Sequence, residues 1–126
     1  MVKVILLIDD DSDDLEMFSE ALSEVDPTIK CLKAIDCFIA LDLLEKKAEP
    51  DLIFLDINMP RMNGWECLSK LKNTEEYKDI PVIMYSTSSH QKEKETASQL
   101  GASDFISKPH NYMDLKNMIR NVIATS

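Results

Sequence analysis

The chain has 126 residues, a length at which we expect a single domain with a buried core. Its 14 lysines and arginines stand against 23 aspartates and glutamates, and the net charge of −9 argues against nucleic acid or a membrane surface as the main partner, because phosphate contacts require cations. The N-terminal apolar run is too short for a signal peptide, and no stretch of about 18 apolar residues predicts a membrane span. We therefore expect a cytoplasmic protein whose partner is another protein or a small ion.

Short apolar segments rich in valine and isoleucine alternate with amphipathic segments along the chain. Strands are predicted at residues 2–8, 29–35, 52–55, 82–85 and 104–106. A first helix is predicted from the helical spacing of Leu15, Phe18, Leu22 and Val25. A last helix is predicted from the spacing of Leu115, Met118, Ile119, Val122 and Ile123.

Three more helices are predicted between the strands. Asp36 can cap the segment CFIALDLLEKK, Gly64 opens the next helix, and Ser88 or Ser89 opens the fourth. That fourth segment, SHQKEKETASQL, is almost wholly polar and is therefore the least anchored to a core. Apolar strands separated by helices indicate a parallel sheet covered on both faces, so the predicted fold class is α/β with five strands and five helices.

The cysteines and histidines predict neither disulfides nor a zinc site. Cys31, Cys37 and Cys67 are odd in number, lack C-x-x-C spacing and have apolar neighbours, so we expect three reduced thiols in the core. His90 and His110 are too few and too isolated to bind zinc.

Polar residues stand where the predicted strands end. Ligands of parallel α/β sheets bind beyond the carboxyl ends of the strands, and these ends carry Asp9, Asp10, Asp56, Ser86 and Lys108. Two unit charges 4 Å apart in a partly desolvated site repel by about 4 kcal/mol, so the three carboxylates require a cation. Carboxylates with room for water suit Mg²⁺, and we expect a magnesium site here.

The run of aspartates after the first strand divides into two roles. Asp13, Asp14 and Glu16 fall in the first turn of the first helix, where negative side chains interact favourably with the helix dipole. We interpret these three as structural, with Asp11 or Ser12 as the N-cap. Asp9 and Asp10 belong instead to the end of the strand.

The order of these motifs resembles the receiver domain of two-component response regulators over essentially the whole chain. The matching features are the acidic pair, LDINMP with a downstream glycine, a serine after the fourth strand, and Lys-Pro after the fifth. The resemblance implies a flavodoxin-like three-layer α/β/α sandwich with strand order 2-1-3-4-5. It also implies that Asp56 accepts a phosphoryl group, that Asp10 binds Mg²⁺ directly, and that Asp9 does so through water. The backbone carbonyl of Asn58 is a further implied ligand, and Mn²⁺ can substitute for Mg²⁺.

The resemblance assigns roles to other residues as well. Ser86 is expected to hydrogen-bond the phosphoryl group and Lys108 to pair with it, with a Lys108–Pro109 bond that is often cis in the family. Asn58 and Ser88 are expected to border the path of the water that hydrolyses the acyl phosphate. Phe105 occupies the switch position, where tyrosine is commoner.

The same resemblance predicts a signalling protein that is not an enzyme in the ordinary sense. We expect one receiver domain over residues 1–126 without an effector domain. Its donor is expected to be a sensor histidine kinase or a phosphotransfer protein, and its output a contact with a downstream protein, as a monomer or a phosphorylation-dependent dimer. The expected output surface lies around Asp104, Phe105 and Lys116. The segment YSTSSH is similar to small receivers paired with phytochrome-type histidine kinases.

Four alternatives compete with this interpretation. An EF-hand loop requires glycine where Asp14 stands, and a preceding helix where a strand is predicted. Phosphatases of the haloacid dehalogenase type share the D-x-D pattern, but Asp13 stands where they carry threonine or valine. A flavodoxin-like FMN binder requires a phosphate loop rich in serine and threonine after the first strand, which the acidic loop contradicts. A pseudo-receiver would keep the fold as an interaction module without phosphorylation.

Overall fold

The computed structural model describes residues 1–88 and 90–126. Its five strands are β1 (Val4–Ile8), β2 (Lys30–Ala34), β3 (Leu52–Asp56), β4 (Val82–Ser86) and β5 (Asp104–Ser107). All neighbouring strands pair in parallel, in the order β2-β1-β3-β4-β5. The predicted flavodoxin-like fold and its strand order are confirmed.

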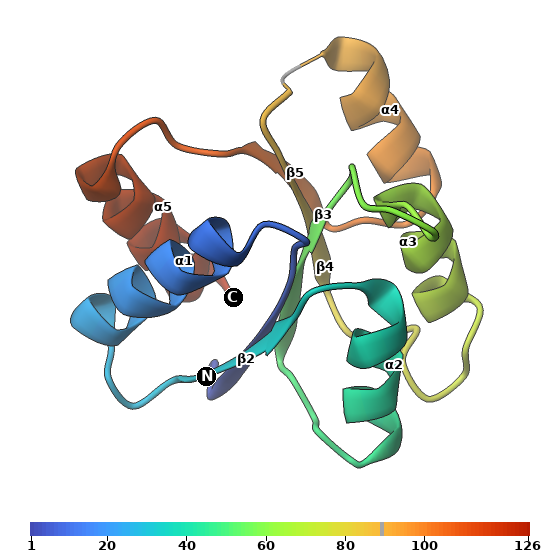
Figure 1. Ribbon diagram of the computed structural model, residues 1–126, viewed down its shortest axis with the longest axis horizontal. Coiled ribbons are helices and arrows are strands. Elements are labelled where there is room, and N and C mark those ends of the chain that lie inside the picture. Colours follow the sequence, from blue (N-terminus) through green and yellow to red (C-terminus); the bar gives the residue numbers. More distant parts are fainter. Residues whose placement is uncertain (89) are drawn as a thin grey trace.

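Helices cover both faces of the sheet. They are α1 (Ser12–Val25), α2 (Cys37–Glu45), α3 (Gly64–Lys72), α4 (Gln91–Gln99) and α5 (Tyr112–Thr125). Figure 1 shows α1 and α5 together on one side of the sheet and α2, α3 and α4 on the other, which gives three layers. Among the helices of the described residues, none is long and apolar enough to cross a membrane.

Side-chain caps explain why α1, α2, α3 and α5 begin where they do, and at α5 the Asn111 side chain accepts from the Asp114 N–H at 2.8 Å. The Asp11 carboxylate accepts hydrogen bonds from the backbone N–H groups of Asp13 and Asp14, and so caps α1. Asp36 caps α2 as predicted, because its carboxylate accepts from the Ile39 N–H at 2.8 Å. At α3 the side chain of Asn63 forms a capping box with Glu66, directly before Gly64.

The start of α4 differs from the prediction. The helix begins at Gln91, and the N-cap residue His90 makes no side-chain capping hydrogen bond. Ser88 lies two residues before this cap, and its hydroxyl accepts a hydrogen bond from the His90 N–H at 3.3 Å. The alternative start, Ser89, lies outside the described residues. Ala97 is the buried residue of α4, in agreement with its predicted weak anchoring.

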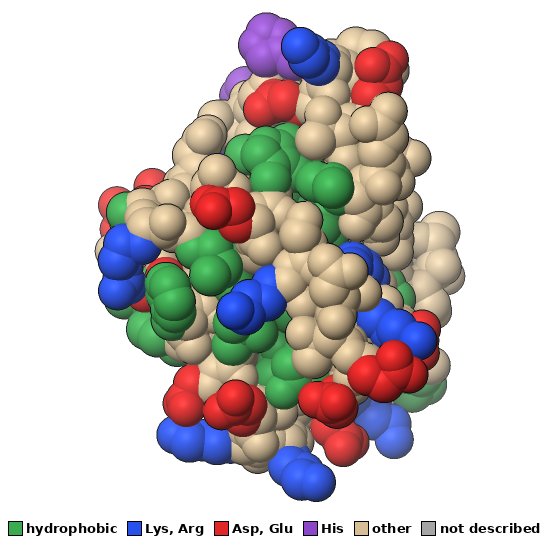
Figure 2. All heavy atoms as spheres, turned by 90° about the vertical axis from the view of Figure 1, so that its right-hand side faces the viewer, with side chains coloured by type: hydrophobic (Ala, Val, Ile, Leu, Met, Phe, Trp, Pro, Cys, Tyr) green, Lys and Arg blue, Asp and Glu red, His purple; other side chains and the backbone are tan. Residues whose placement is uncertain are grey.

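A separate apolar core lies on each side of the sheet. Under α1 and α5, the rings of Phe18, Phe54 and Tyr85 meet edge to face, with centroids 4.9 to 5.9 Å apart. The predicted apolar faces of these two helices supply further residues of this core, including Leu22 and Ile119. The second core lies under the other three helices. Figure 2 shows their outer face, where apolar side chains reach the surface among acidic and basic ones.

Two cysteines do not remain as the reduced thiols that the sequence predicts. Cys37 and Cys67 form a disulfide, with their Cα atoms 5.9 Å apart, and both residues are fully buried. Cys37 is the first residue of α2 and Cys67 belongs to α3, and both helices pack on the same face of the sheet. Their separation of 30 residues along the chain gives no sign of this proximity. Cys31 is a free, half-buried thiol.

Candidate functional site

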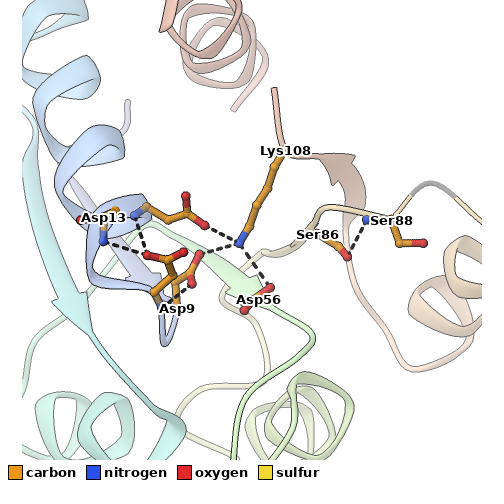
Figure 3. Close-up of polar contacts among 8 residues, drawn as sticks. Asp9, Asp13, Asp56, Ser86, Ser88 and Lys108 are labelled. Atoms are coloured by element: carbon orange, nitrogen blue, oxygen red, sulfur yellow. Dashed lines mark hydrogen bonds and ion pairs between the residues drawn. The ribbon is translucent and has the colours of Figure 1, made fainter. Parts of the chain in front are cut away.

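The carboxyl ends of the strands bring the predicted site residues to one edge of the sheet. Ile8, the last residue of β1, pairs in register with Leu55, and Asp56 pairs with Tyr85. Asp9, Asp56 and Ser86 are therefore neighbours at this edge. Figure 3 shows the long side chain of Lys108 reaching between the carboxylates of Asp9 and Asp56.

Three carboxylates at this edge form a set that fits a divalent cation. Asp9, Asp10 and Asp56 each offer one oxygen atom, and these atoms lie within 4.8 Å of one another. Asp9 is fully buried and Asp56 nearly so, whereas Asp10 is exposed. Asp9 Oδ1 accepts a hydrogen bond from the Asp11 N–H at 3.0 Å, and Oδ2 faces the ammonium nitrogen of Lys108 at 2.9 Å. Hard oxygen donors with one open, exposed side fit Mg²⁺.

Burial and mutual repulsion make these carboxylates hard to ionise. Burial, and next the negative charge of Asp9, raise the pKa of Asp56 from 3.8 to about 6, although Lys108 acts in the opposite direction. Burial likewise raises the pKa of Asp9. Ionisation of Asp56 is therefore less favourable in the folded chain than for a free aspartate, and a bound cation would favour the ionised form.

Lys108 is the cation that the chain itself places in the site. Its ammonium nitrogen lies 2.8 Å from Asp14 Oδ2, 2.9 Å from Asp9 Oδ2 and 3.5 Å from Asp56 Oδ1. Burial lowers the pKa of this ammonium, but the hydrogen bonds and charges of the aspartates outweigh burial and raise the pKa above its usual value. Lys108 is thus held fully charged.

The backbone also fixes Lys108. Its N–H donates to the Ser86 carbonyl at 2.6 Å, which ties the segment after β5 to the end of β4. In the family that the sequence resembles, the bond to Pro109 is often cis. Here it is trans, like every other peptide bond in the part of the chain that the structure describes.

Asp14 contacts Lys108, and the sequence did not predict this contact. We interpreted this residue as a helix-dipole residue only, yet its carboxylate makes a hydrogen-bonded ion pair with Lys108. The available signal was its position: side chains in the first turn of a helix lean towards the helix N-terminus, and α1 starts at the edge that carries the site. The structural interpretation holds for Asp13, which is exposed and enters no ion pair with a described residue.

Ser86 is the last residue of β4, and Ser88 and Asn58 each lie two residues beyond the end of a strand. Ser86 is fully buried, and its hydroxyl oxygen accepts a hydrogen bond from the Ser88 N–H at 3.1 Å. Ser88 is half-buried, and its carbonyl accepts from the Ser107 hydroxyl at 3.1 Å. Asn58 is exposed, two residues beyond the end of β3.

Two residues of the expected output surface, Asp104 and Phe105, are neighbours in β5. Phe105 is half-buried against the core under α4, beside a cavity of about 380 Å³ that Lys94 and Ala97 also line. Asp104 is exposed, and its carboxylate accepts a hydrogen bond from the Phe105 N–H at 2.7 Å.

The position predicted for Lys116 is wrong, because this residue faces α1. Its ammonium nitrogen lies 3.6 Å from Glu24 and 5.2 Å from the centre of the Tyr112 ring. The helix packs against α1, and the side of α5 that lies beside Asp104 is lined by Asn117 and Asn121.

Comparison with known proteins agrees with this geometry. The family model described as response regulator receiver domain matches residues 5–120. The chain is 30% identical over 123 residues to a chemotaxis protein CheY homolog of Campylobacter jejuni, covering 96% of this chain and 92% of that protein. It is also 30% identical over 128 residues to response regulator Rcp1 of Synechocystis, covering 95% and 86%.

Solved structures show the same likeness. The Mn²⁺-bound form of response regulator Rcp1 superposes with a TM-score of 0.83 at 28% identity, covering 95% of this chain and 91% of that one. The phosphorylated cyanobacterial phytochrome response regulator RcpA superposes with a TM-score of 0.88 at 27% identity, covering 100% and 97%. The chain therefore belongs to the response regulator receiver domain family.

Proposed function

We propose that this chain accepts a phosphoryl group on Asp56, with Mg²⁺ bound, from a sensor histidine kinase or a phosphotransfer protein in the cytoplasm. It then passes the signal on through protein contacts that depend on phosphorylation. The observation that carries the proposal is the meeting of the Asp9, Asp10 and Asp56 carboxylates with the Lys108 ammonium at one edge of the sheet.

The chemistry requires a nucleophile and positive charge around the phosphoryl group. A carboxylate oxygen of Asp56 forms the new bond to phosphorus as the bond between phosphorus and the donor breaks, and the donor leaves with its electron pair. Lys108, with its ammonium 3.5 Å from Asp56, neutralises charge on the transferred group. The Ser86 hydroxyl can donate a hydrogen bond to it, because that hydroxyl serves only as an acceptor in its contact with Ser88.

Mg²⁺ would be held by Asp9, Asp10 and Asp56, with the Asn58 carbonyl as a further ligand. When bound, it supplies positive charge to the phosphoryl oxygens. The Mn²⁺-bound form of Rcp1 and the phosphorylated form of RcpA support the proposal by analogy. Mn²⁺ is accordingly expected to replace Mg²⁺.

Incubation with Mg²⁺ and a small phosphodonor tests this function. Intact-mass spectrometry should show the gain of one phosphoryl group that is labile to base, and peptide mapping should place it on Asp56. Asp56→Asn should abolish the gain, whereas Asp13→Asn should retain it, because Asp13 is exposed and outside the carboxylate set. Phosphate on a serine, or none at saturating donor, would overturn the proposal in favour of a pseudo-receiver.

A further inference from the structure

In this structure the Lys108 ammonium lies closer to Asp14 of α1 than to Asp56, the proposed phosphoacceptor. Its ammonium nitrogen lies 2.8 Å from Asp14, which belongs to the first turn of α1, and 3.5 Å from Asp56. The contact with Asp14 has the geometry of a hydrogen bond. Figure 3 shows the dashed contacts of this one ammonium group running to three carboxylates.

The three carboxylates differ in what their removal would do. Asp9 and Asp56 are buried and belong to the proposed metal set, so loss of either one changes the metal site itself. The side chain of Asp14 is 34% exposed and lies outside that set. Without Asp14, Lys108 still has Asp9 and Asp56 as partners, so no buried charge is left unpaired.

We propose that Asp14 is a positioning residue that competes with the phosphoryl group on Asp56 for the ammonium of Lys108. The inference rests on the proposed function of Asp56. A lysine is a compact charge on a flexible stem, and each contact that it keeps with Asp14 restrains its movement towards Asp56. Asp14 thereby reduces the stability of the phosphorylated form and slows phosphoryl uptake.

Asp13 provides a matched control. It lies in the same first turn of α1 and carries the same charge, so its replacement by asparagine causes the same loss of helix-dipole interaction. It is exposed and enters no ion pair with the residues that the structure describes. An effect of Asp14→Asn that Asp13→Asn lacks therefore comes from the surroundings of Asp14, which are the Lys108 ammonium and the neighbouring Asp9 carboxylate.

The experiment measures two quantities at saturating Mg²⁺. The first is the apparent dissociation constant of beryllofluoride, a mimic of the phosphoryl group, and the second is the rate of phosphorylation by phosphoramidate. Asp14→Asn should tighten beryllofluoride binding and raise the rate, each by about two- to fivefold, the range expected for a partly exposed ion pair. Asp13→Asn should stay close to wild type, and Asp14→Glu should restore wild-type values.

A second comparison removes the cation. In a Lys108→Ala background, which we expect to retain weak phosphorylation, Asp14→Asn should cause no more change than Asp13→Asn. A far-UV circular dichroism spectrum and an unfolding midpoint establish that each variant is folded. If Lys108→Ala does not fold, the comparison of Asp14→Asn, Asp13→Asn and Asp14→Glu still decides the question.

Two results would overturn the inference while the proposed function stands. One is an Asp14→Asn variant that matches Asp13→Asn in both measurements, and the other is weaker binding of beryllofluoride in Asp14→Asn. A wild-type protein that neither binds beryllofluoride nor takes up a phosphoryl group would instead refute the proposed function, and the inference with it.

Discussion

A Cβ atom on Gly64 would lie 2.3 Å from the backbone oxygen of Asp56 and 2.6 Å from the Cα atom of Ile57. The Gly64 N–H also donates to the Ile57 carbonyl at 2.7 Å. The first residue of α3 is thus packed directly against the backbone of the proposed phosphoacceptor. Both obstructing atoms belong to the backbone, so neither can move aside as a flexible side chain could.

Gly64→Ala should therefore lower the free energy of unfolding by about 1–3 kcal/mol and slow phosphorylation of Asp56, because the new methyl group displaces the β3–α3 connection. Gly101→Ala is the control: its φ of +95° costs stability, but the nearest atom to a new Cβ is the Lys72 side chain at 3.5 Å. Chemical denaturation and the phosphorylation rate measure the two effects. Equal phosphorylation by both variants would contradict the role assigned to Gly64.

The raised pKa of Asp56 predicts a pH dependence of stability. Because its pKa is about 6 in the folded chain and 3.8 as the ordinary value, the folded state binds the proton more tightly than the unfolded state. The contribution of protonated Asp56 to the free energy of unfolding is fully present below pH 3.8. It is lost as the pH rises through about 6, and the loss amounts to at most about 3 kcal/mol. In metal-free buffer, Asp56→Asn should therefore become progressively more stable than wild type over this range.

Denaturation curves of wild type and Asp56→Asn at several pH values measure the difference between their free energies of unfolding. Titrating groups that behave alike in both proteins do not contribute to this difference. Saturating Mg²⁺ should reduce it, since a cation favours ionised Asp56. A difference that stays constant with pH would show that Asp56 titrates normally.

The exposed position of Asp10 predicts opposite effects on metal binding and stability. Asp10→Asn removes a proposed ligand, so Mg²⁺ affinity should fall by about tenfold or more. Metal-free stability should stay the same or rise, because one source of repulsion on Asp56 is gone. Isothermal titration with Mg²⁺ measures the first effect, and Asp13→Asn should change neither quantity by more than a few tenths of a kcal/mol.

The disulfide between Cys37 and Cys67 predicts a dependence on reductant. The bond closes a loop of about 30 residues, for which the chain-entropy model gives about 3–4 kcal/mol of stability. Adding a thiol reductant should lower the wild-type free energy of unfolding by this amount. Cys31→Ala should keep the dependence and the double variant Cys37→Ala/Cys67→Ala should lose it, whereas indifference of wild type to reductant would refute the linkage.

Ser86 is expected to couple Asp56 to the α4–β5 surface. Ser86→Ala should leave Asp56 able to accept a phosphoryl group but reduce the response of residues 90–110, because a group shifts an equilibrium only through contacts that differ between the two states. NMR amide shifts with and without beryllofluoride measure this, with the exposed Ser103→Ala as control. Undiminished shifts in Ser86→Ala would place the coupling elsewhere.

Asp9, Asp56 and Lys108 could be placed from the sequence because each stands at or just after the end of a strand, and parallel strands end at a common edge. Asp36 and Gly64 could be placed because capping depends on only a few neighbouring residues. These predictions use local chemistry together with one topological rule.

The contacts that were missed depend on how helices rotate and pack. The pairing of Asp14 with Lys108 joins α1 to the segment after β5, and the Cys37–Cys67 bond requires α2 and α3 to face each other. Lys116 was misplaced because its surroundings are set by the packing of α5 against α1. Periodicity shows that a helix has an apolar face, but it does not show what lies beside its polar residues.

The Cys37–Cys67 bond also changes which parts of the chain can open separately. Residues 37–67 form a covalently closed loop that contains the whole of β3, and with it Asp56. A local opening that separates the start of α2 from α3 requires the disulfide to be reduced first. While the bond is intact, we therefore expect α2, α3 and the strand β3 to open together in hydrogen exchange. Reduction of the bond is then expected to speed the exchange of the backbone amides around Asp56 with solvent.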